Sequence, residues 1–514
     1  MSCTTFVSKM PRRPSTFELP LPPRDRRSPA YRWLYAALRD RILDGHLRPG
    51  TRLPSTRDLA AQYELSRGTV VQAFEELKSE GYLDCTIGSG TRVSRILPEE
   101  LLHAGGERDP RSSPLPESKR RLAAYARRTT AFENYDQRPS RAFRANLPAL
   151  DLFPTDLWAK IAARRLRSAT VSDLLVCDPM GFKPLRRAVA DYLTASRGVN
   201  CDADQIVIVS GVQEALDLAA RILAGPGDRV CIEDPGYPGA ASAFEAVGAQ
   251  LVPIGVDSEG MKLDWRRLKG ARLVYVTPGH QFPLGVTMSL TRRLQLLGWA
   301  RRTGAAIFED DYDSEYRYAG RPVPALQQLD SGSAVLFAGS FSKVLFPSLR
   351  MGYAVLPSDL VDRFSAAISI STRHAPMLEQ MILCDFIAGG HFARHLRRMR
   401  QVYSERRSAL IEGAKAYWGG LLEISGVEAG LQTAAWLCAE MDAEAATVAA
   451  AKRKVEIVPV NRYSRNQRLP SAVQLGFAAF DPREIRRSVR ELAIALEAAR
   501  EGPGARDPAG ANPP

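Results

Sequence analysis

Strand-like and helix-like patterns alternate from residue 143 to about residue 500, and this alternation constrains the fold more than any other feature of the chain. Short apolar runs such as residues 205–209 and 334–338 have the length of buried strands, and longer stretches with helical spacing of apolar residues lie between them. Consecutive parallel strands need a crossover helix between them. The pattern therefore predicts an α/β domain built around a mainly parallel sheet.

Polar motifs follow the expected strands of this domain. They lie at residues 233–238, 277–285, 309–313 and 340–343. Because open α/β sheets bind ligands at the carboxyl ends of their strands, these motifs should gather along one edge of the sheet. Residues 210–213, Ser-Gly-Val-Gln, lead from a strand into a helix, and the N–H groups of such a turn can bind an anion. Many α/β turns carry glycine for steric reasons alone, which is the alternative.

Lys343 stands in the last of these motifs, Ser340-Phe-Ser-Lys, where an apolar run opens into a loop. Lysine forms Schiff bases once burial or a neighbouring cation lowers its pKa, and pyridoxal phosphate (PLP) is an aldehyde cofactor that uses one. Most lysines that follow a strand are simply solvated. The motif alone therefore leaves both interpretations open.

The positive charge is concentrated in the first third of the chain. Of the net charge of +13, residues 1–145 contribute +9, from 26 Lys and Arg against 17 Asp and Glu, and residues 146–514 contribute +4. This asymmetry favours an N-terminal module that meets a polyanion. A basic tail that only keeps the protein soluble is the alternative.

No uninterrupted apolar run is long enough to span a membrane, and the N-terminus lacks the apolar core of a signal peptide, so we expect a cytoplasmic protein with no membrane partner. The seven Cys are scattered and contain no C-x-x-C pair. Neither a disulfide framework nor a metal site is therefore expected.

Helical spacing of apolar residues begins near residue 28 and continues to Gly45. After a turn, Ser55 can cap a short second helix, and Ser66 stands at the start of a third. Two short helices separated by a tight turn are typical of a helix-turn-helix. Residues 82–87 and 91–93 then predict two short strands around a glycine turn, which would form a wing.

This stretch resembles the winged-helix DNA-binding domain of the GntR family over about 65 residues. The matching residues are Leu53-Pro54-Ser55-x-Arg57-x-Leu59-Ala60, Ser66-Arg67-x-Thr69-Val70, Glu80-Gly81-Tyr82 and Gly88-x-Gly90-Thr91.

The resemblance implies an operator of double-stranded DNA as partner. Arg67 would read bases in the major groove, with Ser66 and Thr69 beside it at the start of the recognition helix. The backbone contacts would come from Arg52, Ser55, Arg57 and the wing residues Gly90 and Thr91. A small helical domain with incidental arginines is the alternative.

Residues 143–500, with their motifs in this order, resemble the fold-type I aminotransferases over roughly 350 residues. Together with the GntR-like module, the chain resembles the MocR subfamily of PLP-binding transcriptional regulators, and the interval from Asp310 to Lys343 fits that subfamily. The resemblance implies a multidomain fold. Its N-terminal winged helix-turn-helix would be mainly α with a two-stranded wing, and its C-terminal part would be a PLP-dependent transferase of fold type I, with a large mainly parallel sheet domain and a small α+β domain.

The resemblance also implies roles for residues of the PLP site. Lys343 would form the Schiff base with PLP, and Asp310 would be the carboxylate partner of the ring nitrogen. Tyr312 would donate to the phenolic oxygen, Tyr237 would stack on the ring, and His280 would lie near the ring or one layer behind it. The phosphate would be held by Gly211, Val212, Gln213, Ser340, Ser342 and Arg350.

Two positions depart from the aminotransferase pattern. Val212 stands where a hydroxyl residue is common, which removes one hydrogen bond to the phosphate but keeps the backbone donors. Gln474 stands where an arginine would hold the α-carboxylate of a substrate. The effector is therefore not an ordinary amino acid held by its carboxylate, or it is held differently. Three nearby residues could substitute for the missing arginine, namely Arg462, Arg465 and Arg468.

The boundaries that follow are a disordered basic arm at residues 1–27, the winged helix at 28–95, a flexible linker at 96–142, the PLP-binding domain at 143–500 and a disordered tail at 501–514. We expect a homodimeric transcriptional regulator that senses PLP itself or an amino-group effector, and contact with RNA polymerase is left open. The rival hypothesis is a catalytically active aminotransferase that carries an accessory DNA-binding domain.

Overall fold

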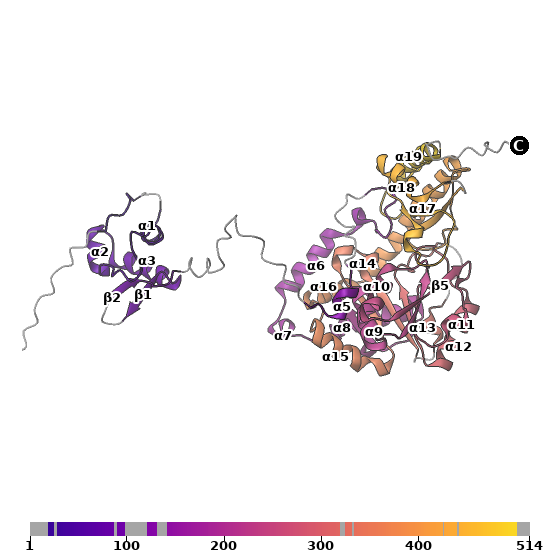
Figure 1. Cartoon of the computed structure of the whole chain (residues 1–514), viewed down its shortest axis with the longest axis horizontal. Helices are drawn as coiled ribbons and strands as arrows, with labels where there is room; N and C mark the ends of the chain where they lie inside the picture. Colours follow the sequence, from indigo (N-terminus) through magenta and orange to yellow (C-terminus); the bar gives the residue numbers. More distant parts are fainter. Residues whose placement is uncertain are drawn as a thin grey trace, which may run out of the picture. The chain divides into compact units, whose positions relative to one another are not determined.

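Figure 1 shows the computed structural model of the chain, which divides into two compact units, Met1–Arg120 and Arg121–Pro514. The structure describes residues 19–24, 28–86, 90–97, 121–130, 141–318, 324–330, 334–424, 426–438 and 441–500. The division between the units falls inside the segment expected to be a linker. Most of that linker, most of the expected basic arm and the whole expected tail lie outside the described residues.

The first unit contains the helices and the wing in the expected order. Its elements are α1 (Ala30–Leu43), α2 (Thr56–Gln62), α3 (Arg67–Ser79), β1 (Leu83–Thr86) and β2 (Gly90–Val93). The two strands pair antiparallel. The apolar faces of the three helices meet in one core, as the helical spacing of the sequence predicted, although Val71, predicted on the buried face of α3, is only partly buried. That core includes Leu34, Leu38, Leu59, Val70, Phe74 and Leu77.

Hydroxyl side chains set the starts of α2 and α3. Ser55 Oγ accepts a hydrogen bond of 3.2 Å from the N–H of Asp58, and Ser66 Oγ accepts one of 3.1 Å from the N–H of Thr69. Each bond satisfies a backbone donor that has no partner within the first turn of its helix. The caps therefore explain why α2 begins at Thr56 and α3 at Arg67.

Part of the segment before α1 packs on this unit. Leu19 is buried in the core of the winged helix, and its carbonyl oxygen accepts hydrogen bonds from Gln62 Nε2, at 3.2 Å, and from the hydroxyl of Tyr63. Residues 19–24 of the expected basic arm are therefore attached at the end of α2.

The second unit is organised around an eight-stranded sheet of order β3-β10-β9-β8-β7-β4-β5-β6. β10 runs antiparallel to its neighbours β3 and β9, and the short β6 pairs antiparallel with β5. The remaining pairs are parallel, as the sequence predicted. The strands are β3 (Ile206–Val209), β4 (Arg229–Asp234), β5 (Gln250–Asp257), β6 (Gly260–Met261), β7 (Ala271–Val276), β8 (Ala306–Asp311), β9 (Val335–Ser340) and β10 (Gly352–Val355).

Helices cover both faces of this sheet, and alternate residues of a strand point to opposite layers. Val207 and Val209 pack against α9 (Val212–Leu223), α10 (Pro238–Val247) and α15 (Val361–Ser371). Ile206 and Ile208 pack on the other face. The helices of that face include α8 (Lys183–Arg197), α12 (Leu290–Thr303) and α16 (Met377–Ala388).

Further elements complete the large domain. They are α5 (Ala124–Arg128), α6 (Thr155–Arg167), α7 (Val171–Leu174), α11 (Trp265–Leu268), α13 (Leu326–Leu329), α14 (Phe341–Val344), η2 (Leu150–Leu152), η3 (Ala203–Gln205), η4 (Pro347–Leu349) and η5 (Ser358–Leu360). Two helices of the second unit, α5 and α10, lie against each other.

A smaller antiparallel sheet of order β11-β12-β14-β13 forms the C-terminal part of the unit. Three helices, α17, α18 and α19, pack with it, and α19 contacts both α17 and α18. These elements confirm the expected small α+β domain. They are β11 (Leu422–Ile424), β12 (Gln432–Leu437), β13 (Val458–Pro459), β14 (Ala472–Gly476), α17 (His391–Tyr417), α18 (Ala443–Lys452), α19 (Pro482–Arg500) and η6 (Val460–Tyr463).

One buried carboxylate joins the small domain to the large sheet. Asp234, the last residue of β4, accepts hydrogen bonds of 2.8 Å from the hydroxyl of Ser464 and from the N–H groups of Arg465 and Asn466, and one of 3.0 Å from the N–H of Gln467. The loop after η6 is thereby held at the end of a strand of the large domain.

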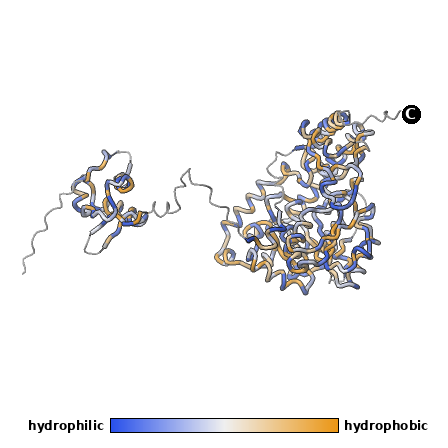
Figure 2. The backbone as a smooth tube through the Cα atoms, viewed as in Figure 1, coloured by the Kyte–Doolittle hydropathy of each residue, from blue (hydrophilic) through white to orange (hydrophobic). Residues whose placement is uncertain are grey.

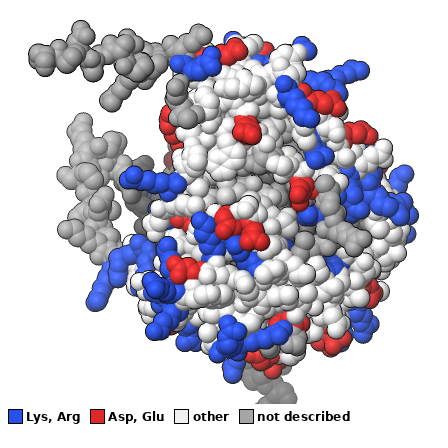
Figure 3. Space-filling view, turned by 90° about the vertical axis from the view of Figure 1, so that its right-hand side faces the viewer, with Lys and Arg blue, Asp and Glu red and all other residues white. Residues whose placement is uncertain are grey.

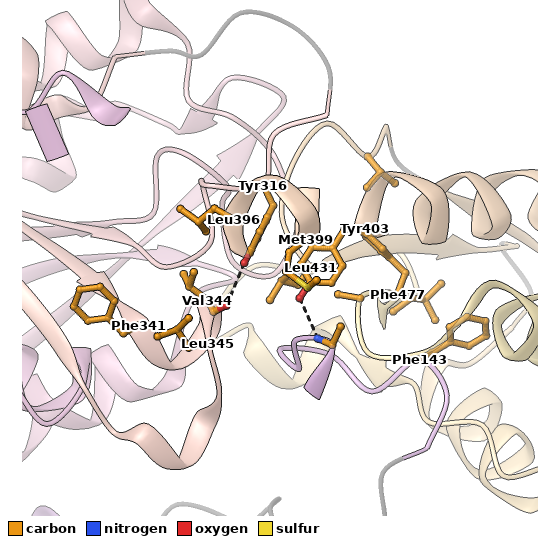
Figure 4. Close-up of a cluster of buried hydrophobic side chains, with 14 of the residues drawn as sticks. Phe143, Tyr316, Phe341, Val344, Leu345, Leu396, Met399, Tyr403, Leu431 and Phe477 are labelled. Atoms are coloured by element: carbon orange, nitrogen blue, oxygen red, sulfur yellow. Dashed lines mark hydrogen bonds between the residues drawn. The ribbon is translucent and has the colours of Figure 1, made fainter. Parts of the chain in front are cut away.

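The apolar core extends from the large domain into the small one. Figure 4 shows Phe341, beside the site motif, and Phe477, after β14, in the same cluster. Two polar groups in this cluster are satisfied: the hydroxyl of Tyr316 donates to the carbonyl of Val344 at 3.3 Å, and that of Tyr403 accepts from the N–H of Ala149 at 3.0 Å. Figure 2 shows how hydrophobic and hydrophilic segments alternate along the backbone. Within the described part of the chain, no helix is long and apolar enough to cross a membrane.

Candidate PLP site and DNA-binding surface

A cavity of about 700 Å³ lies at the edge of the large sheet where β3, β7, β8 and β9 end. All the residues predicted for the cofactor except His280 line it. The predicted lining residues are Gly211, Val212, Gln213, Tyr237, Asp310, Tyr312, Ser340, Ser342, Lys343 and Arg350, and they are joined by Arg144, Asn146, Leu147, Leu150, Tyr275, Thr277, Phe282, Pro347 and Ser348.

Lys343 reaches this cavity from α14, which begins directly after β9. Phe341 is 1% exposed and packs into the core, so it fixes the turn between the strand and the lysine. Lys343 Nζ donates a hydrogen bond of 3.2 Å to the carbonyl oxygen of Asn146. The lysine is therefore partly buried at a strand end rather than solvated on a helix face.

Asp310 lies near the end of β8 and is 6% exposed. Its Oδ2 accepts a hydrogen bond of 2.8 Å from the hydroxyl of Tyr275, and its Oδ1 is buried with no hydrogen-bond partner among the described residues. Burial raises the pKa of Asp310 to about 7, while the Tyr275 bond and the nearby Lys343 lower it. A buried carboxylate oxygen without a donor fits a cationic group of a ligand in this cavity.

A cradle for an anion lies at the start of α9. Gly211 has a φ of 99°, a backbone conformation that favours glycine, and it is the N-cap residue of α9, two positions after the end of β3. The guanidinium of Arg350 lies 3.6–3.7 Å from the position that a Cβ on Gly211 would take. The positive end of the helix and an arginine thus meet at one place on the cavity wall.

The hydroxyls of Tyr237 and Tyr312 are each oriented by a neighbour. Tyr237 donates to Gln213 Oε1 at 3.2 Å, and the hydroxyl of Tyr312 lies 3.1 Å from His280 Nδ1. His280 is buried and its Nδ1 lies 2.9 Å from Asp313 Oδ1. The histidine predicted near the ring therefore lies behind Tyr312. Burial raises the pKa of Tyr237 to about 12 and that of Tyr312 well above its ordinary value.

Gln474 and the three arginines expected to compensate for it do not line the cavity. Gln474 is completely buried, and its Oε1 accepts a hydrogen bond of 3.2 Å from the hydroxyl of Tyr463. Arg462 pairs with Glu444 and Arg465 with Glu245 at the surface, and Arg468 is exposed.

Sequence reasoning missed Arg144 and Asn146, which stand on the cavity wall. They belong to residues 141–147, which enter the second unit from the side of the expected linker. Phe143 and Asn146 have φ values of 67° and 63°, which are uncommon for residues other than glycine. The sequence signal available was weak, since it consisted of an arginine and an asparagine about 200 positions before Lys343.

These groups fit PLP. Among the described residues, one cavity is lined by a lysine for the aldehyde of that cofactor and by an anion cradle for its phosphate. It is also lined by a buried carboxylate oxygen without a donor, which suits the ring nitrogen. PLP held there would supply an electrophilic carbon that takes up primary amines.

The residues predicted to contact DNA all lie in the first unit. Arg52, Arg57 and Arg67 are exposed, and Arg67 is the first residue of α3. The guanidinium of Arg52 lies 3.0 Å from the position of a Cβ on Gly90, which begins β2 next to the turn of the wing. The hydroxyls of Ser55 and Ser66 cap helices, and Thr69 Oγ1 lies 2.8 Å from Ser66 Oγ, while Thr91 is partly exposed on β2.

One face of the second unit has mixed charge. On the face drawn in Figure 3, Lys and Arg side chains lie beside Asp and Glu side chains. This agrees with the small net charge of residues 146–514. The stronger positive charge of the first 145 residues therefore remains the electrostatic feature that favours a polyanion.

Together, the sheet order and the cavity are those of an aminotransferase-like domain, which follows a winged helix in one chain. A family model for aminotransferase class I and II matches residues 146–492, and one for bacterial regulatory proteins of the gntR family matches residues 30–93.

Similar proteins combine both parts. The chain is 38% identical to the probable rhizopine catabolism regulatory protein MocR of Rhizobium meliloti, with 92% of this chain and 95% of that protein covered. It is 28% identical to the HTH-type pyridoxine biosynthesis transcriptional regulator PdxR of Corynebacterium glutamicum, with 89% and 94% covered. The chain belongs to the MocR subfamily of GntR-type transcriptional regulators, in which a DNA-binding domain is fused to an aminotransferase-like domain.

Solved structures agree with this fold. The α-aminoadipate aminotransferase LysN of Thermus thermophilus, complexed with N-(5'-phosphopyridoxyl)-L-leucine, is 29% identical with a TM-score of 0.66, covering 74% of this chain and 97% of that one. The kynurenine aminotransferase of Pyrococcus horikoshii is 26% identical with a TM-score of 0.69, covering 76% and 100%. The aminotransferase class of the domain implies PLP as its cofactor.

Proposed function

We propose that this regulator holds PLP covalently at Lys343 and responds to a primary amine that competes with the lysine for the cofactor. The observation that carries the proposal is the arrangement of Lys343, Asp310 and Arg350 on one cavity wall. The buried Oδ1 of Asp310 would pair with the ring nitrogen, and Arg350 with the turn at Gly211 would hold the phosphate.

An amine that displaces Lys343 changes the contacts of this residue inside the second unit. Its Nζ donates to Asn146, in the segment that follows the expected linker. Effector binding can shift a regulator only through such differences between states. We propose that the shift reaches the winged helix through this segment and that the protein acts as a homodimer on its operator.

In the winged helix, we propose that Arg67 reads a base from the start of α3. Arg52 and Arg57 would bind phosphates near the wing and α2, and Gly90 and Thr91 would touch the backbone beside them. Because the hydroxyls of Ser55 and Ser66 already cap helices, they would meet DNA with their remaining hydrogen-bonding capacity.

The first test is the visible absorbance of protein-bound PLP in the wild type and in Lys343→Ala. The variant should lose the covalent chromophore, whereas Lys183→Ala, which removes an exposed lysine at the start of α8, should keep it. Persistence of the same absorbance in Lys343→Ala would overturn the attachment site. A gel-shift on the DNA upstream of the gene, with and without PLP and a panel of amines, then tests the response.

A working aminotransferase is the second candidate, and the likeness to solved aminotransferases with an intact Lys343 and Asp310 favours it. The experiment that separates the two is transamination with excess amino donor and keto acid. Steady turnover over many cycles would establish the enzyme. A single exchange per protein, coupled to changed DNA binding, would support the regulator.

A further inference from the structure

The hydroxyl of Tyr312 stands at the end of a chain of polar contacts that begins at a buried carboxylate. Asp313 is 1% exposed and His280 is 4% exposed. His280 Nδ1 lies 2.9 Å from Asp313 Oδ1, 3.1 Å from Asp313 Oδ2 and 3.1 Å from the hydroxyl oxygen of Tyr312. One ring nitrogen therefore faces both the carboxylate and the hydroxyl of a residue that lines the cavity.

The loop before β12 holds this pair in place. The N–H of Leu431 donates a hydrogen bond of 3.1 Å to Asp313 Oδ2. Gly430 has a φ of 82°, and a Cβ there would lie 2.1 Å from a ring carbon of His280 and 2.6 Å from Asp313 Oδ2. A glycine is therefore needed for the loop to pack against the pair. The N–H of Gly430 also donates to the carbonyl of Tyr316 at 2.8 Å, which fixes the loop itself.

The carboxylate decides which ring nitrogen of His280 carries a proton. Carboxylate oxygens accept hydrogen bonds and do not donate them, so the nitrogen that faces both oxygens of Asp313 has to be an N–H group. In either charge state of the ring, Nδ1 then has no lone pair for the proton of Tyr312. The Tyr312 oxygen can share the N–H of His280 as an acceptor, but it cannot donate to this nitrogen.

A second polar neighbour of the Tyr312 hydroxyl is the amide of Gln432. Burial raises the pKa of Tyr312 well above its ordinary value, and Gln432 lowers it, as a hydrogen-bond donor does. The oxygen of the same amide accepts a hydrogen bond of 2.8 Å from the N–H of Asn146. Both neighbours therefore turn donors toward the Tyr312 oxygen, and the hydroxyl proton is left to point into the cavity.

We propose that Asp313 and His280 are positioning residues that aim the hydroxyl proton of Tyr312 at the phenolic oxygen of PLP. This inference deepens the proposed function, because it concerns the same cofactor site. When PLP is attached to Lys343, its phenolic oxygen can accept a hydrogen bond either from the protonated Schiff-base nitrogen or from Tyr312. Donation from Tyr312 weakens the first of these bonds, so the nitrogen loses its proton more easily.

The first experiment determines the tautomer of His280 in the protein without PLP. The chain has six His, so labelling with 15N-histidine gives few signals in an NMR spectrum, and those missing from His280→Asn belong to His280. We expect the proton on Nδ1 in the wild type. In Asp313→Asn, the new amide oxygen can still accept from Leu431 while its NH₂ group faces Nδ1. The proton should then lie on Nε2, which frees Nδ1 to accept from Tyr312.

The second experiment titrates the visible absorbance of protein-bound PLP with pH. Tyr312→Phe should raise the acid–base midpoint of the chromophore by about one pH unit, the equivalent of one hydrogen bond. Asp313→Asn should shift the midpoint in the same direction, because it turns the Tyr312 proton away from the cavity. The sign is diagnostic, since removing a negative charge alone would favour loss of the proton and lower the midpoint.

Two further variants separate positioning from charge. Asp311→Asn removes another buried carboxylate of the same motif, one that pairs with Arg197 at 2.8 Å, and the midpoint should not rise. His280→Asn keeps a side-chain N–H that can donate to Asp313, so its midpoint should stay below that of Asp313→Asn. The thermal midpoint of each variant shows whether the fold is intact.

The outcomes distinguish this inference from the proposed function. If PLP does not bind, the proposed function fails, whereas the tautomer of His280 can still be measured. A proton on Nε2 alone in the wild type would overturn the positioning role even with PLP attached at Lys343. The same holds if the midpoint falls in Asp313→Asn as it does in Asp311→Asn. Should Asp313→Asn fail to fold, the tautomer in the wild type remains the deciding measurement.

Discussion

The hydroxyl of Tyr275 donates to one oxygen of Asp310 at 2.8 Å, and the other oxygen of the same carboxyl is buried without a donor among the described residues. The two residues lie on neighbouring parallel strands, β7 and β8. Tyr275 therefore fixes the orientation of the carboxyl and leaves the second oxygen for a ligand. The hydrogen bond from Tyr275 therefore keeps the Asp310 carboxyl in one orientation inside an otherwise apolar sheet.

Removing this donor should weaken cofactor binding. Tyr275→Phe keeps the ring packed against Phe308 but removes the hydrogen bond that lowers the pKa of Asp310. The carboxyl should then be protonated more often at pH 7, and PLP affinity should fall about tenfold, the equivalent of one charge-assisted hydrogen bond. An absorbance titration measures the change. Tyr417→Phe, at an exposed position, is the control, and equal affinity in both variants would contradict this role.

Asp310 should also make the stability of the PLP-free protein depend on pH. Burial raises its pKa from 3.8 to about 7, so between these values the folded state binds more protons than the unfolded state. The free energy of unfolding should therefore decrease as pH rises from about 4 to 7, by up to about 1.4 kcal/mol per pH unit for this one group.

Urea unfolding across this pH range checks that slope. In Asp310→Asn the slope should become less negative by the contribution of one proton, whereas Asp359→Asn, at an exposed position, should match the wild type. The remaining slope comes from other buried carboxyls, such as Glu233, whose pKa is also raised to about 7 by burial. Identical slopes in the wild type and Asp310→Asn would show that Asp310 is ionised in the folded protein at low pH.

Gly476→Ala should displace the segment of residues 141–147 that lies against β14. The new methyl group overlaps backbone atoms of Arg144 and Ala145, which cannot rotate away as a side chain can. We expect a loss of about 2 kcal/mol or more in the free energy of unfolding, in the range of overpacked sites. Gly419→Ala is the matched control because no atom lies within 4 Å of its added Cβ. A stability change equal to that of the control would mean that the segment moves freely.

The effect on DNA affinity of removing a positive charge from α3 should depend on where along the helix the residue lies. Arg67→Ala and Lys78→Ala each remove one exposed positive charge, the first at the start of the helix and the second in its last turn. Loss of Arg67 should weaken binding to the operator by about 1–3 kcal/mol and relax its sequence preference, with PLP retained. Lys78→Ala should change operator affinity little. Similar effects of both variants would mean that α3 does not enter the groove by its N-terminal end.

Local patterns in the sequence predicted most of the fold. Helical spacing placed Leu34, Val70 and Leu77 in the core of the winged helix, and apolar runs placed the strands whose ends carry Asp310 and Lys343. These predictions succeeded because burial periodicity and strand-end motifs depend on neighbouring residues.

The remaining features depend on contacts between distant segments. Arg144 reaches the cavity because Phe143 and Asn146 adopt uncommon backbone conformations and Gly476, more than 300 positions later, gives them space. Arg462 and Arg465 looked suitable by their distance from Gln474 in sequence, but surface carboxylates hold them. No local sequence pattern predicts contacts between residues so far apart in the chain.

The four hydrogen bonds that Asp234 accepts from residues 464–467 limit how the molecule can respond to an effector. If the small domain swung away as a rigid body, all four hydrogen bonds would break together and water would have to replace them, at a net cost of about 1 kcal/mol per bond. The amplitude of any motion of the small domain relative to the large sheet is therefore restricted at Asp234. A response that keeps these four bonds leaves the small domain and the large sheet in a fixed relation, so it has to change other contacts of the second unit, such as the one between Lys343 and Asn146.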